Sequence, residues 1–132
     1  MEFEVKVPIL GFSDVQKVKL EKVDDLFTKL ENVDDVYPSF MLVNPFAFRD
    51  YDFEIPAAVK VLLGLREKTN LLVMNIMIIQ EPIEESTINF IAPIVFNFDN
   101  STMGQVVLDS TKYPQYGITE PISNYIDSNN IK

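Results

Sequence analysis

The chain has 132 residues, 47% of them hydrophobic, and carries 20 acidic against 11 basic residues, which gives a net charge of −9. This apolar content excludes a wholly disordered chain, and the length fits one domain with one core. The negative charge disfavours direct binding to nucleic acid, which needs a clustered positive surface. A basic protein surface is a more natural partner, although charge also serves solubility alone.

The sequence contains neither cysteine nor histidine. Their absence excludes disulfides, thiolate nucleophiles, Ser-His-Asp triads and imidazole metal ligands, so we expect no enzyme, no cofactor and no metal site. The first residues, MEFEVKV, have acidic residues where a signal peptide needs positive charge, and they alternate instead of forming an apolar run. The most apolar stretch, residues 71–79, is shorter than the roughly 20 residues that span a bilayer. We therefore expect a cytoplasmic protein that does not enter a membrane.

The N-terminal part reads as a β-hairpin. Apolar and charged side chains alternate over residues 2–7, and Pro8 ends this first strand. A turn at residues 11–14 leads to a second alternation over residues 17–21. Two paired strands are the prediction.

Residues 24–33 are ambiguous. Asp24 or Asp25 suits the N-cap of a short helix. The apolar residues that follow share one helical face: Leu26, Phe27, Leu30 and Val33. Local periodicity therefore favours a helix, whereas residues 39–43 read as a buried strand.

An acidic strand is predicted at residues 49–55, because charged and apolar side chains alternate there. Pro56 ends it, and residues 57–63 then have helical spacing with Gly64 as the C-terminal cap. The apolar residues of the strand face one way: Tyr51, Phe53 and Ile55. The carboxylates face the other way: Asp50, Asp52 and Glu54.

The C-terminal half predicts more strands. Residues 71–79 read as a central strand buried on both faces, and residues 87–92 and 94–98 as one strand bent at Pro93. After a turn at residues 99–102, another strand is expected at residues 105–108.

The end of the chain is polar. We expect a helical turn at residues 119–122, followed by a fraying tail over residues 123–132. The pattern as a whole predicts an all-β fold, a small antiparallel β-barrel-like or sandwich domain with one short helix. We expect residues 1–132 to form that single domain.

The acidic triplet Asp50, Asp52 and Glu54 is the sharpest charged feature. Successive carboxylates on one strand face lie about 6–7 Å apart. The run lacks the glycine and the final glutamate of a calcium-binding loop, and similar environments do not give the split pKa values of paired catalytic carboxylates. A solvated strand face and an electrostatic docking edge both remain open. Phe46 and Phe48 precede the triplet.

Three blocks in this order resemble the flagellar assembly factor FliW family: NPFAFRDYDFEIP at residues 44–56, NFIAPIVFN at residues 89–97, and GQVVLDSTKY at residues 104–113. The element LGFSDV at residues 10–15 is similar to the N-terminal turn of that family. The chain differs in its short start, and it has PQYGITEPI where the family commonly carries an arginine.

The resemblance implies a non-enzymatic β-barrel-like protein that binds the translational regulator CsrA, relieves its repression of flagellin, and binds flagellin in competition. It also implies a strand at residues 27–33. On this basis Phe46, Phe48, Asp50, Asp52 and Glu54 are the predicted partner-binding residues. We further expect a monomer or weak dimer without direct nucleic-acid binding. The alternative is a small carbohydrate- or ligand-binding β module.

Overall fold

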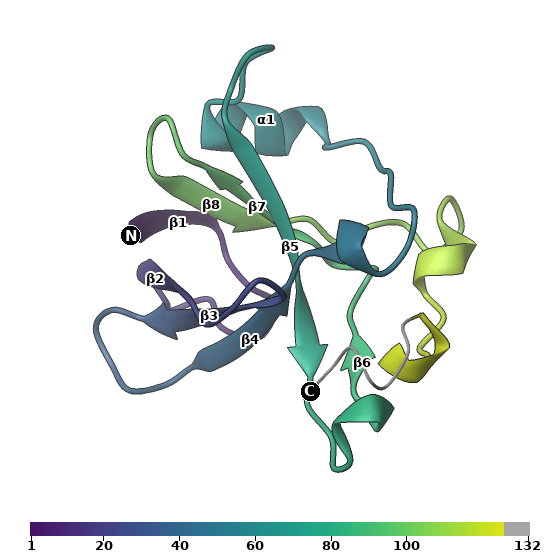
Figure 1. Ribbon diagram of the computed structural model, residues 1–132. Helices are drawn as coiled ribbons and strands as arrows, with labels where there is room; N and C mark the ends of the chain where they lie inside the picture. Colours follow the sequence, from purple (N-terminus) through teal and green to yellow (C-terminus); the bar gives the residue numbers. More distant parts are fainter. Residues whose placement is uncertain (126–132) are drawn as a thin grey trace.

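The computed structural model describes residues 1–125. In order, its elements are β1 (Glu2–Val7), β2 (Lys17–Lys22), β3 (Phe27–Asn32), β4 (Ser39–Val43), α1 (Ala57–Leu63), β5 (Leu71–Ile78), β6 (Thr87–Ile88), β7 (Ile94–Asn97) and β8 (Thr102–Gln105). Short 3₁₀ turns lie at Pro45–Ala47, Ile83–Glu85, Pro114–Tyr116 and Ile122–Asn124. Figure 1 shows α1 packed over one end of a curved sheet.

The sheet closes into a barrel, which confirms the predicted fold class. Its strand order is β4-β3-β2-β1-β8-β7-β5-β6, and β4 also pairs with β5, so seven strands form a ring with β6 attached to β5. A ring with an odd number of strands cannot alternate direction throughout. One neighbouring pair must be parallel, and here it is β1 with β8. Closure leaves few open backbone edges.

Two hydrophobic clusters stabilise the molecule. The inner cluster fills the barrel and includes Phe3, Leu42 and Phe96. The outer cluster, which includes Val43 and Val95, packs between the barrel wall and the segments 44–65 and 106–125. Since neighbouring residues of β4 and β7 belong to different clusters, these strands are buried on both faces. Figure 1 shows the chain between β4 and α1 and the chain after β8 on the same side of the barrel, with α1 over one end of it.

The helix favoured by local periodicity at residues 24–33 is wrong. Phe27–Asn32 is β3, as the family resemblance implied, and it pairs antiparallel with both β2 and β4. Leu30 points into the inner cluster. Pairing on both sides decides the conformation here, because tertiary context overrides weak local propensity.

The strand predicted at residues 49–55 is also wrong, although its side chains do alternate between faces. Residues 51–56 have no regular secondary structure and pair with no strand. They follow the 3₁₀ turn Pro45–Ala47, which starts at Asn44, whose side chain accepts a hydrogen bond from Phe46 N. Side chains, and not a neighbouring strand, form hydrogen bonds with the backbone of this segment.

Several strand limits shift relative to the prediction. The strand expected at residues 105–108 is β8, Thr102–Gln105, and the piece expected at residues 87–92 shortens to β6. Both β6 and β7 pair with β5. The single bent strand that we predicted is therefore two strands, and Pro93 lies in the gap between them. The helical turn expected at residues 119–122 is wrong in position, because the 3₁₀ turn lies at Ile122–Asn124 and residues 119 and 120 have no regular structure. Most of the predicted tail, residues 126–132, lies outside the described residues.

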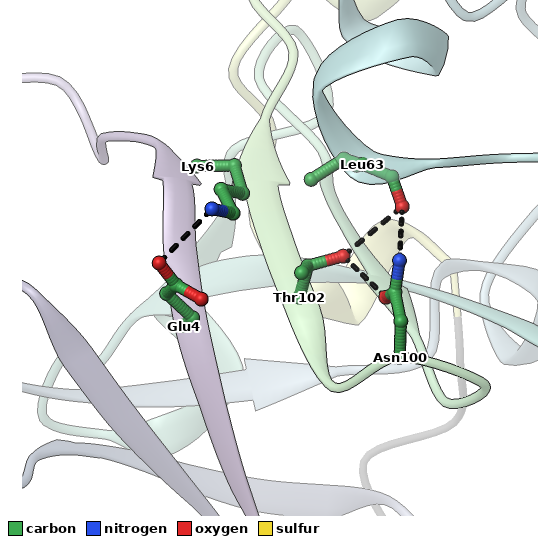
Figure 2. A network of polar contacts seen from close by, with 5 residues as sticks. All are labelled: Glu4, Lys6, Leu63, Asn100 and Thr102. Carbon is green, nitrogen blue, oxygen red and sulfur yellow. Dashed lines mark hydrogen bonds and ion pairs between the residues drawn. The ribbon is translucent and has the colours of Figure 1, made fainter.

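The helix predicted at residues 57–63 is confirmed as α1, with Gly64 in the left-handed region at φ 65° as its C-cap. The carbonyl oxygen of Leu63 accepts hydrogen bonds from Asn97 Nδ2, Asn100 Nδ2 and Thr102 Oγ1. Figure 2 shows the last two of these bonds, which attach the end of α1 to the β7–β8 hairpin. Within the described residues, no helix has the length and apolar character to cross a membrane.

Candidate functional site

The acidic segment, residues 50–54, lies on the outer face of the outer cluster. Asp50, Asp52 and Glu54 are exposed, whereas Tyr51 is only 7% exposed and Phe53 is half-buried. The segment therefore presents three carboxylates to solvent and anchors itself through its aromatic side chains.

Tyrosine hydroxyls hold the backbone of the acidic segment. The hydroxyl of Tyr116 accepts a hydrogen bond from Asp52 N at 2.8 Å and donates one to Asp52 O at 3.0 Å. The hydroxyl of Tyr113 accepts from Glu54 N at 3.0 Å. These bonds replace the ladder that a neighbouring strand would supply, so the extended shape is fixed without a strand partner.

Tyr51 forms the buried end of this anchor. Its hydroxyl donates to Phe90 O and accepts from Asn75 Nδ2 at 3.1 Å. Burial, the largest cause, raises the pKa of Tyr51 well above its ordinary value of 10.0. The phenol therefore remains a neutral donor at physiological pH.

Arg49 clamps the C-terminal part of the chain beside the acidic segment. Its guanidinium carbon lies 5.3 Å from the ring centroid of Phe90, 5.0 Å from that of Tyr116 and 5.9 Å from that of Tyr125. Its Nη1 also donates to Gln115 O at 3.4 Å. Cation–π contacts of this kind stabilise partly buried sites, so the clamp orders residues 113–125 against the segment.

The predicted partner-binding residues divide into two groups. Asp50, Asp52 and Glu54 are exposed, and Phe46 is 57% exposed with its ring 6.1 Å from that of Tyr51, so these residues lie near one another. Phe48 is 6% exposed and belongs to the outer cluster. A partner cannot reach its side chain in this state. Phe48 therefore contributes by packing in the outer cluster beneath the exposed residues.

Most carboxylates of the acidic segment are not neutralised by an ion pair with a basic side chain. Lys112 Nζ lies 3.5 Å from Glu54 Oε2, and both side chains are largely exposed. Among the described residues, Asp50 and Asp52 have no ion pair within 4.0 Å. In the same part of the chain, no three His, Cys, Asp or Glu side chains are grouped so that they could hold a metal ion. The arrangement suits electrostatic contact with a cationic partner.

Sequence reasoning missed Arg49, Tyr113 and Tyr116 as parts of this site. The two tyrosines lie about sixty residues beyond the segment they hold, with Tyr116 64 positions from Asp52. No local periodicity indicates such a contact. Only the closed fold brings the groups together.

Comparison with known proteins places the chain in one family. A family model described as FliW protein matches residues 2–122. Flagellar assembly factor FliW 2 of Wolinella succinogenes is 62% identical over 128 residues, which cover 97% of this chain and 94% of that protein. Flagellar assembly factor FliW of Sulfurimonas denitrificans is 53% identical, with 96% of this chain and 98% of that protein covered.

A relative from Campylobacter lari, also a flagellar assembly factor FliW, is 47% identical and covers 96% of this chain and 97% of its own. The fold agrees with a crystal structure of the flagellar assembly factor FliW at a TM-score of 0.79, with 21% identity, 91% of this chain and 82% of that chain covered. The family model and these identities together show that the chain belongs to the FliW family of flagellar assembly factors.

Proposed function

We propose that this protein is a non-enzymatic regulator of flagellar assembly that acts in the cytoplasm by sequestering CsrA and by binding flagellin in a partner switch. One observation carries the proposal: a rigid, exposed acidic segment whose backbone is already held by Tyr113 and Tyr116. A preorganised surface loses little conformational entropy on binding.

Charge supports CsrA as one partner. CsrA, an RNA-binding regulator, presents a basic surface, and the carboxylates of Asp50 and Asp52 have no cationic partner in the described structure. Opposite charges on two surfaces speed their encounter and fix their orientation. With a net charge of −9, direct contact with RNA is disfavoured, so any effect on translation passes through the regulator.

The protein is proposed to act as a single domain and a monomer or weak dimer, because the closed barrel leaves few open strand edges and like charge opposes self-association. A carbohydrate-binding module would need exposed aromatic rings on a concave face. Among the described residues the exposed aromatics are Tyr37, between β3 and β4, and Phe46 beside the acidic segment. Single rings of this kind give that alternative no support.

A competition measurement tests the proposal. Fluorescently labelled CsrA is bound to the full-length protein and then titrated with purified flagellin monomer. We expect flagellin to release CsrA, because one protein cannot serve both partners at overlapping surfaces. In a parallel titration, flagellin leader RNA without CsrA should not bind the protein.

Two results would contradict the proposal. One is the absence of binding to both CsrA and flagellin. The other is a stable complex that contains all three proteins at saturating flagellin. Salt-dependent binding of the leader RNA to the isolated protein would overturn the exclusion of direct RNA contact.

A further inference from the structure

Asn75 is the one polar residue of β5, whose sequence is LLVMNIMI, and it is 0% exposed. Its neighbours on the same face of the strand, Val73 and Met77, pack in the outer cluster. The side chain of Asn75 therefore points to the side of the barrel wall on which the acidic segment lies. An apolar side chain would continue this row without burying an amide.

The amide nitrogen of Asn75 joins two segments to the barrel wall. Its Nδ2 donates to the hydroxyl of Tyr51 at 3.1 Å and to Asn89 O at 2.9 Å. A carbonyl oxygen can only accept, so the contact with Asn89 O determines which end of the amide faces these groups. The hydroxyl of Tyr51 is thus held twice, because it also donates to Phe90 O.

The same amide carries a cost in stability. Asn75 Oδ1 is buried and has no hydrogen-bond partner among residues 1–125, and no other buried side-chain nitrogen or oxygen in this part of the chain lacks one. Burying an unpaired carbonyl oxygen destabilises a protein, and buried polar groups in native structures are rarely unpaired. The role of Asn75 therefore lies in the groups that its Nδ2 holds and not in packing.

Tyr51 connects Asn75 to the acidic segment. Tyr51 lies between Asp50 and Asp52 in the chain, and its ring centroid is 4.7 Å from that of Tyr116. The hydroxyl of Tyr116 in turn bonds both the N–H and the C=O of Asp52. A shift of the Tyr51 ring would displace the exposed carboxylates through the backbone and would disturb the hydroxyl bonds at Asp52.

We propose that Asn75 is a positioning residue, which fixes Tyr51 and thereby holds the carboxylates of the acidic segment in the geometry that binds the basic partner. The effect on binding rests on the proposed function, in which that partner is CsrA. A segment that is fixed before contact loses less conformational entropy on binding. Without the amide of Asn75, the barrel stays intact, while the acidic segment loosens and binds more weakly.

The test compares Asn75→Leu with Asn97→Leu. Leucine has the branched shape of asparagine without its N–H groups. Asn97 is also buried, at 1% exposure, but its Nδ2 holds Leu63 O at the end of α1. Asn75→Ala, which cannot overpack the site, replaces Asn75→Leu if the leucine variant does not fold.

Hydrogen exchange separates the acidic segment from the barrel. The Asp52 amide, which donates to the hydroxyl of Tyr116, reports on the segment, and the amides of β3 report on the barrel. For Asn75→Leu we expect exchange at Asp52 to be at least about fivefold faster than in the wild type, with the β3 amides within about twofold. Asn97→Leu should leave Asp52 within about twofold of wild type, even where it destabilises the barrel.

Binding of purified CsrA provides the second readout. We expect the Kd to rise at least about fivefold for Asn75→Leu and to stay within about twofold for Asn97→Leu. Tyr51→Phe removes the hydroxyl that Asn75 holds. Adding Asn75→Leu to Tyr51→Phe should therefore weaken binding little further, since the two changes break the same link.

The outcomes are distinguishable. Equal acceleration at Asp52 and in β3 would make Asn75 a purely structural residue, and an unchanged Asp52 amide would remove the link through Tyr51; either result overturns the proposal. Unchanged affinity for CsrA in a variant whose Asp52 amide exchanges faster would also overturn it, while the proposed function would stand. If the wild type does not bind CsrA, the proposed function fails, and hydrogen exchange still decides whether Asn75 positions the segment.

Discussion

Replacing Tyr51 by alanine is expected to lower the free energy of unfolding by about 3–5 kcal/mol, the usual cost of deleting a buried aromatic side chain. The ring centroid of Tyr51 lies 4.7 Å from that of Tyr116, 5.5 Å from that of Phe53 and 5.6 Å from that of Phe90. The variant therefore leaves a cavity where the acidic segment joins the outer cluster. Chemical denaturation measures the loss.

Two controls separate the causes of that loss. Tyr51→Phe keeps the ring but removes the partner of Phe90 O and Asn75 Nδ2, and we expect a cost of about 1–3 kcal/mol. Tyr37→Ala removes a tyrosine that is 77% exposed and should stay within about 0.5 kcal/mol of wild type. If Tyr51→Ala were as stable as Tyr37→Ala, the anchor described here would not exist.

Replacing Gly104 by alanine should destabilise the barrel at its closing pair. A Cβ atom at this position would lie 2.7 Å from Val7 Cβ and 2.9 Å from Val7 Cγ2. β1 and β8 must separate to admit it, and overpacking of this kind costs about 1–3 kcal/mol. Denaturant unfolding should show the loss, with a lower transition midpoint.

A double-mutant cycle assigns this cost to the strand contact. Val7→Gly removes the side chain that meets the new Cβ atom, so Gly104→Ala should cost less in that background than in the wild type. Gly117→Ala is the matched control, because its Cβ atom would lie 3.7 Å from the nearest backbone atom, Pro114 O. Equal costs for Gly104→Ala in both backgrounds would contradict the close approach of the two strands.

Elements with a local signature could be predicted from the sequence. The alternation of β1 and β2 and the glycine that ends α1 depend on neighbours a few residues apart, and the structure has them where expected. β3 could not be predicted from its own residues, because its apolar spacing also fits a helix. Only pairing with β2 and β4 decides it.

The candidate site shows the same division. The exposure of Asp50, Asp52 and Glu54 follows from alternation alone, even though the segment is not a strand. The burial of Phe48 and the hydroxyl bonds from Tyr116 depend on contacts across the fold. Such contacts join residues far apart in the chain and produce no periodic pattern in the sequence. The sequence therefore predicts the charged face, but not the side chains that hold the segment in place.

The association rate with CsrA of the triple variant Asp50→Asn, Asp52→Asn, Glu54→Gln tests the central claim most directly. The control is Asp14→Asn, Glu21→Gln, Asp34→Asn, three exposed positions on β2 and on the turns next to β2 and β3. Each variant changes the net charge from −9 by the same three units. Tyr51 and Phe53 keep the segment in place, so both variants should remain folded.

At low salt we expect the acidic-segment variant to associate roughly tenfold more slowly than wild type and to lose most of its salt dependence, because rim charges act mainly on encounter. The control should change the rate much less, since its charges lie away from the contact. Equal association rates for wild type and the acidic-segment variant at low salt, with both proteins folded, would contradict the assignment of residues 50–54 to partner binding.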